Sequence, residues 1–119
     1  MANERRKYPR VPVIGEANLL LSGLVRSGAL MNICPSGIQI ECQHTLIEQL
    51  SQYKSDAGLF PNVELEFDLS GADKVKSVCN VSYCRRLSQD NYHLGLNFVS
   101  LSAADERRVS AFIDHTAAA

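Results

Sequence analysis

The sequence predicts an all-β domain, an antiparallel barrel or sandwich, completed by one helix near the C-terminus. Short segments in which apolar and polar residues alternate recur along the chain, and turn residues separate them. This alternation is typical of strands with one buried face. The chain has 119 residues, of which 45% are hydrophobic, and this size and composition suit a single domain with one core.

Six strands follow one another along the chain. Ser22-Gly23 is a two-residue hairpin signal, because glycine tolerates the positive φ that such turns need. Pro35-Ser36-Gly37 and residues 88–91 are further turn signals. The strands are expected at residues 13–21, 24–33, 38–42, 63–68, 75–86 and 92–98. In the fifth strand one inward phase is predicted to include Val75, Cys79, Val81 and Tyr83.

The segments outside these strands predict helical structure. Residues 43–61 form a long connection with room for one or two helical turns. Ser102 and Asp105 resemble a capping box, which predicts that a helix begins here. The apolar stripe of this helix follows at Val109, Phe112 and Ile113. We expect the helix to close one end of the barrel.

Basic charge gathers at the N-terminus, although the whole chain has a net charge of −1. Residues 1–10 carry four basic residues and one acidic residue, a local net charge of +3. A short basic arm either contacts a polyanion or is solvated. A barrel that binds RNA or single-stranded DNA needs exposed aromatic side chains and a basic groove. The negative net charge and the few aromatic residues argue against such a nucleic-acid polymer as partner.

The sequence holds no motif for catalysis, for a metal or for a membrane span. Nucleophile-elbow, phosphate-loop and zinc-ligand spacings are absent from it, so we expect neither enzymatic activity nor a cofactor. The four cysteines are interpreted chiefly as structural thiols: Cys34, Cys42, Cys79 and Cys84. No apolar run approaches the roughly 18 residues of a membrane span, and no secretory signal opens the chain. We therefore expect a cytoplasmic protein without membrane insertion.

The basic arm carries two arginines at a fixed spacing. Three residues separate Arg6 from Arg10, and one of them, Pro9, stiffens the segment. Two guanidinium groups on such a segment can clamp phosphates or the O6/N7 edge of a guanine. We expect residues 1–12 to be a flexible arm that is unordered without ligand, and residues 13–115 to be the barrel with its helix.

A second candidate motif is Asn32-Ile33-Cys34-Pro35-Ser36-Gly37, at the end of the second strand. If Ile33 points into the core, Asn32 and Cys34 must both point outward. An outward asparagine can read the donor and acceptor groups of a base. Gly37 permits either a close approach of another group or a positive φ. Taken alone, this segment is an ordinary turn.

Together the two motifs resemble those of the PilZ family, the bacterial receptor domain for cyclic di-GMP. The family's RxxxR motif reads here Arg6-Lys7-Tyr8-Pro9-Arg10, and its (D/N)xSxxG motif reads residues 32–37. Residues 94–102 resemble the closing strand of the family and the start of its helix, and the resemblance covers about residues 4–114. It implies a six-stranded antiparallel β-barrel of the split-barrel type with a C-terminal α-helix.

The resemblance implies a stand-alone receptor that orders its arm on binding cyclic di-GMP and signals to a protein partner in motility or biofilm regulation. An arginine at position 5 implies two intercalated cyclic di-GMP molecules per chain. The implied ligand-binding residues are Arg5, Arg6, Arg10, Asn32, Cys34, Ser36 and Gly37. The alternative is a PilZ-like protein–protein adaptor of pilus or motility systems that binds no nucleotide. The oligomeric state, monomer or dimer, is left open.

One position departs from the family pattern. Cys34 stands where the family has serine, and a thiol is the weaker hydrogen-bonding group. The loss of one such hydrogen bond costs about 1 kcal/mol. A thiol beside an arginine can also gain reactivity, so a redox-sensitive Cys34 is a further hypothesis.

Three polar residues on the last two strands have open roles. His93 alternates with inward positions, so it should face outward as a solvated side chain. Arg85 and Arg86 end the fifth strand and point to opposite faces. One of them could reach the ligand surface, or both serve as edge charges that discourage aggregation.

Overall fold

The computed structural model of the protein describes residues 10–69 and 73–118. The predicted site residues Arg5 and Arg6 lie outside these ranges. The elements are β1 (Val11–Pro12), β2 (Glu16–Leu21), β3 (Leu24–Cys34), β4 (Gly37–Gln43), α1 (His44–Gln52), β5 (Val63–Leu69), β6 (Asp73–Arg86), β7 (Asn91–Leu101) and α2 (Ala103–Ala118).

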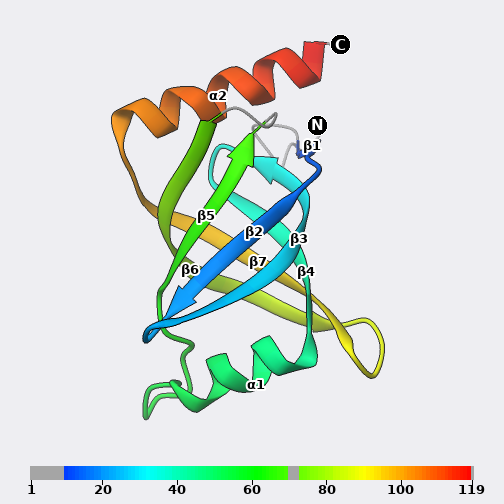
Figure 1. The fold of residues 1–119 in the computed structure, drawn as a ribbon, viewed down its shortest axis with the longest axis vertical. Helices are drawn as coiled ribbons and strands as arrows, with labels where there is room; N and C mark the ends of the chain where they lie inside the picture. Colours follow the sequence, from blue (N-terminus) through cyan, green and yellow to red (C-terminus); the bar gives the residue numbers. More distant parts are fainter. Residues whose placement is uncertain (1–9, 70–72, 119) are drawn as a thin grey trace, which may run out of the picture.

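Six strands form a closed antiparallel barrel, which confirms the predicted fold class. Neighbouring strands pair in the order β3-β2-β5-β6-β7-β4, and pairing of β4 with β3 closes the ring (Figure 1). The short strand β1 adds to the edge of β3, with Val11 opposite Ile33 and Pro12 opposite Asn32. The start of the described chain is therefore attached to the strand that carries the second motif.

The β2–β3 hairpin forms as its sequence predicts. Ser22 and Gly23 both have positive φ, 50° and 83°, and Leu21 lies opposite Leu24. Two positive φ values are the mark of the type I′ turn, whose twist matches that of the strands. The strand itself begins at Glu16, three residues later than expected, after Gly15 with φ 138°.

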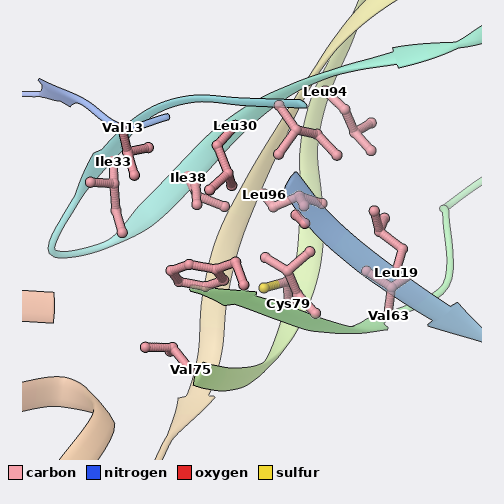
Figure 2. Packing of buried hydrophobic residues seen from close by; sticks show 14 of the residues in the cluster. Val13, Leu19, Leu30, Ile33, Ile38, Val63, Val75, Cys79, Leu94 and Leu96 are labelled. Atoms are coloured by element: carbon pink, nitrogen blue, oxygen red, sulfur yellow. The ribbon is translucent and has the colours of Figure 1, made fainter. Parts of the chain in front are cut away.

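Alternate residues of all six barrel strands meet in one core. Leu19 from β2, Leu65 from β5, Cys79 from β6 and Leu94 from β7 are each at most 1% exposed. Figure 2 shows Leu19, Val63, Cys79 and Leu96 projecting from different strands toward a common interior. Apolar burial of this kind is the main stabilising term of the domain.

The two helices cover opposite ends of the barrel (Figure 1). In α1 the buried residues are Leu46, Ile47 and Leu50, and its nine residues make it slightly longer than the one or two turns expected. In α2 the predicted stripe is inward: Val109 and Ile113 are buried, and Phe112 packs against the core. None of the helices in the described chain is long and apolar enough to cross a membrane.

The start of α2 is fixed by the predicted cap. The backbone N–H of Asp105 donates to Ser102 Oγ at 3.0 Å. The Asp105 carboxylate accepts from the backbone N–H of Lys76 at 3.3 Å and from Arg108 at 2.5 Å. Asp105 thereby ties the first turn of α2 to β6, which places the helix across the barrel end.

The cysteines of the structure are free thiols. Cys42 and Cys79 lie in the core, where they act as small apolar side chains. Burial raises the pKa of the Cys42 thiol to about 12 and also raises the pKa of Cys79 and Cys84. These three thiols are therefore protonated at neutral pH. Over residues 10–69 and 73–118, no group of His, Cys, Asp or Glu side chains could hold a metal ion.

The core predicts a sharp contrast between two leucines. Leu65 is fully buried and Leu59 is 67% exposed. We expect Leu65→Ala to lower the free energy of unfolding by about 2–5 kcal/mol, because it leaves a cavity, and Leu59→Ala to change it by less than about 0.5 kcal/mol. Urea denaturation followed by circular dichroism measures both. Equal losses in the two variants would contradict this assignment of the core.

Candidate functional site

The motif residues of the described chain meet at a shallow hollow on the outer wall of the barrel. It lies where the end of β3, the β3–β4 turn and the facing parts of β6 and β7 come together. Five predicted site residues line it: Arg10, Asn32, Cys34, Ser36 and Gly37. Its volume is about 70 Å³, which holds water molecules rather than a nucleotide. A nucleotide would therefore rest on the hollow rather than inside it.

Asn32 faces this hollow, as strand alternation predicts. Its neighbour Ile33 is fully buried in the core, so Asn32 points to the outer face. The Asn32 amide donates from Nδ2 to Gln39 Oε1 on β4 at 2.5 Å. This hydrogen bond orients the asparagine side chain on the barrel wall, next to exposed Arg10.

The β3–β4 turn is fixed by local hydrogen bonds and by a close backbone approach. Cys34 Sγ lies 3.2 Å from Ser36 Oγ, and the carbonyl of Ser36 accepts from the Phe98 N–H at 2.9 Å. A Cβ at Gly37 would collide with the carbonyl oxygen of Leu96 on β7. The sequence left two reasons for a glycine here, a positive φ or the close approach of another group. The structure supports the close approach.

Tyr83 is a component of the hollow that the sequence pattern misplaced. The pairing of β6 with β7 shifts register between Val81 and Tyr83, so the prediction that Tyr83 shares the inward phase is wrong. The ring lies over Gly95, where a Cβ would collide with it, and 37% of Tyr83 is exposed. The sequence did hold one signal for this contact. Gly95 is a glycine inside a strand, and such positions often mark the close approach of another group.

Three more polar lining residues were not predicted from the sequence. Gln39 comes from β4, Ser82 from the register shift in β6, and Asn97 from β7 beside Gly95. They add amide and hydroxyl groups to the wall. Cross-strand pairing assembles this set, and no local sequence signal marks it.

Arg85, Arg86 and His93, whose roles the sequence left open, do not line the hollow. Arg86 donates to the carbonyls of Ser88 and Gln89 at 3.0 and 3.2 Å, so it stabilises its own turn. Arg85 lies 3.3 Å from Nδ1 of His93. His93 is on the outer face as expected, but its side chain is only 14% exposed and is therefore not simply solvated.

The hollow combines chemical groups suited to a nucleotide. Arg10 supplies a cationic fork, Asn32 an amide and Tyr83 an aromatic face. A guanidinium fork matches a phosphate or a guanine edge, an amide reads base edges, and aromatic rings stack on bases. Among the described residues, those that line the hollow include no histidine and no carboxylate.

Comparison with known proteins finds a family match and structural relatives. The sequence matches the model of the PilZ domain over residues 4–115. No curated protein is a significant match to the sequence. The structure resembles the inhibitor of motility MotI/DgrA of Bacillus subtilis, with TM-score 0.70, 14% identity and coverage of 98% of this chain and 53% of that chain.

Two similar structures contain cyclic di-GMP. The PilZ domain of YcgR from Escherichia coli has TM-score 0.60 and 13% identity, with 97% of this chain and 93% of that chain covered. The PlzA protein of Borreliella burgdorferi has TM-score 0.60 and 11% identity, with coverages of 89% and 46%. The chain thus spans about half the length of MotI and PlzA. At these identities the likeness establishes the fold.

The two glycines of the hollow predict different effects on stability. In Gly37→Ala the new methyl meets backbone of β7, whereas in Gly95→Ala it meets the movable ring of Tyr83. We expect Gly37→Ala to cost more than Gly95→Ala, with the first about 1–3 kcal/mol or larger. Urea denaturation of both variants checks the order. A Gly37→Ala protein as stable as the parent would refute the close approach.

Proposed function

The chain belongs to the PilZ domain family, and from this premise we propose that it is a receptor for cyclic di-GMP that binds its ligand over the hollow on the outer wall of the barrel. Domains of this family are receptors and effectors rather than enzymes. The observation that carries the proposal is the meeting of Arg10 and Asn32 in one hollow. These residues come from the two sequence motifs, which are about twenty positions apart.

In the proposed complex each lining group has a distinct task. Arg10 contacts a phosphate or the O6/N7 edge of a guanine through its planar fork. Asn32, already held by Gln39, hydrogen-bonds a guanine. Tyr83 offers the exposed part of its ring for stacking. Charge-assisted hydrogen bonds are the strongest of these contacts, so Arg10 contributes most.

The hollow alone is too shallow to enclose a dinucleotide, so the arm must complete the site. Arg6 precedes Arg10 by four residues and Arg5 by five, and an extended chain spans about 3.3–3.6 Å per residue. Both arginines are therefore within about 18 Å of Arg10 and can reach a ligand resting over the hollow. With three guanidinium groups near crowded phosphates, we propose that two cyclic di-GMP molecules bind together.

Cys34 changes the polar edge of the site only slightly. Its thiol lies 3.2 Å from the Ser36 hydroxyl, so a hydroxyl is present beside the position where the family has serine. Ser36 is exposed and can donate a hydrogen bond toward the ligand. The substitution then costs about 1 kcal/mol or less of binding energy.

In this proposal the arm also transmits the signal to a partner protein. When the arm closes on the ligand, the chain gains a surface that the free protein lacks, and a partner protein can bind there. Some similar structures fit a regulatory role: MotI is described as an inhibitor of motility and MrkH as a transcription regulatory factor. An adaptor that binds no nucleotide does not need a cation and an amide together in one hollow. Arg10 and Asn32 supply this pair, which favours the receptor over the adaptor.

Removal of Arg10 should weaken binding. We expect Arg10→Ala to reduce the affinity for cyclic di-GMP at least tenfold, because a hydrogen bond to a charged group is worth about 1.5–3 kcal/mol. Isothermal titration calorimetry measures the change. Arg26→Ala is the matched control, since Arg26 contacts Gln49 of α1 and does not line the hollow. No heat from the parent protein, or equal affinity of the Arg10 variant, would sink the proposal.

The number of ligands depends on Arg5. The parent protein should bind close to two cyclic di-GMP molecules per chain, and Arg5→Ala should shift this stoichiometry toward one, because the second molecule then lacks a counter-charge for its phosphates. Calorimetry on both proteins gives the two ratios. A ratio of two that survives Arg5→Ala would contradict the role of Arg5.

A further inference from the structure

A second polar row crosses the outer wall immediately beyond the hollow. In this row Glu41 of β4 lies opposite His93 of β7, and His93 lies opposite Arg85 of β6. The corresponding row in the hollow consists of Gln39 of β4, Gly95 of β7 and Tyr83 of β6, with Gly95 in the centre. The two rows are two residues apart along β7, which is about 6.7 Å. A two-base ligand resting over Gly95 therefore has the second row within reach.

The hydrogen-bonding direction of this row is fixed by the arginine. An Arg85 guanidinium nitrogen lies 3.3 Å from His93 Nδ1, and arginine has donors only. Nδ1 must then accept, so in the neutral imidazole the proton is on Nε2. This Nε2 lies 3.8 Å from a Glu41 carboxylate oxygen. Across the wall the groups run from an acceptor, Glu41, through His93 to a donor, Arg85.

The outer members of the row are open to solvent, and the central one is covered. The Glu41 side chain is 38% exposed and the His93 side chain 14%, while Arg85 is exposed. Glu41 and Arg85 are thus available to a ligand on the wall. His93 lies between them and orients the Arg85 guanidinium through the contact at Nδ1. The carboxylate and the guanidinium, one on each side of His93, offer acceptors and donors on the same wall.

We propose that Glu41 and Arg85, with His93 between them, bind the base edge of a second guanine of the ligand and determine the specificity for guanine. This inference rests on the proposed function. Guanine carries the N1–H and N2–H donors beside the O6 acceptor. The carboxylate of Glu41 accepts from the two donors, and the guanidinium of Arg85 donates to O6, which it recognises through its fork.

Other ligand groups fit the row less well. Adenine has an acceptor at N1 and a donor at N6, so its acceptor would face the carboxylate and leave a polar group unpaired, which is costly. A phosphate has only acceptors and a negative charge, and Glu41 would repel it. The row therefore discriminates by rejecting adenine as well as by binding guanine.

The test compares three ligands on one pair of variants. Calorimetry with cyclic di-GMP, cyclic GMP-AMP and cyclic di-AMP is performed on the parent, on Glu41→Gln and on Glu64→Gln. Glutamine keeps the size of the side chain but loses the charge and one acceptor. We expect Glu41→Gln to weaken cyclic di-GMP binding about tenfold and cyclic GMP-AMP binding less, so the ratio of the two affinities falls. Glu64 is an exposed residue of β5 outside this wall, so its variant should keep the parent's ratio.

The outcomes separate this inference from the proposed function. If the parent binds cyclic di-GMP, Arg10→Ala weakens binding and Glu41→Gln keeps the parent's affinity ratio, the inference is wrong and the proposed function stands. If the parent gives no heat with cyclic di-GMP, both are wrong. Arg85→Ala provides a second measurement, with an expected loss of about tenfold for cyclic di-GMP. Thermal melting without ligand verifies that each variant is folded.

Discussion

The pairing of β4 between β3 and β7 is the constraint on which this structure depends. It closes the barrel, and it brings Asn32 of β3, Gln39 of β4 and Gly95 of β7 onto one stretch of outer wall. The absence of a side chain at Gly37 lets the β4 backbone approach the Leu96 carbonyl. The same glycine ends the second motif, so one residue serves both the closure of the barrel and the shape of the candidate site.

The wall and the arm have complementary physical roles. Strands hold the wall residues in fixed rows, and groups on rigid elements need little reordering when a ligand binds. The segment before Arg10 contributes the positive charge of Arg5, Arg6 and Lys7. In the proposed receptor, the wall recognises the base and the positive charge of the arm adds affinity.

The outer wall also shows how one irregularity changes a surface. The register shift in β6 turns Tyr83 outward over Gly95, where a regular strand would have placed it inside. Arg85 follows two residues later on the same face, opposite His93. A bulge thus sets both the aromatic part of the hollow and the alignment of the neighbouring polar row. Bulges often aim side chains at functional sites in this way.

The sequence by itself determined the features that local chemistry encodes. Alternation marked all six barrel strands, Ser22-Gly23 marked the hairpin, and Ser102 marked the start of α2. The two motifs predicted Arg10 and Asn32 as site residues, and both line the same hollow. These signals depend on neighbours within a few positions, so they can be read without knowledge of the fold.

Only the tertiary structure decided which distant strands lie side by side and in which register. The outward turn of Tyr83, the close approach at Gly37 and the row of Glu41, His93 and Arg85 all result from pairings between segments far apart in the chain. A shift of one residue moves a side chain to the other face of a sheet. No local pattern encodes such a shift, because it depends on how two whole strands fit together.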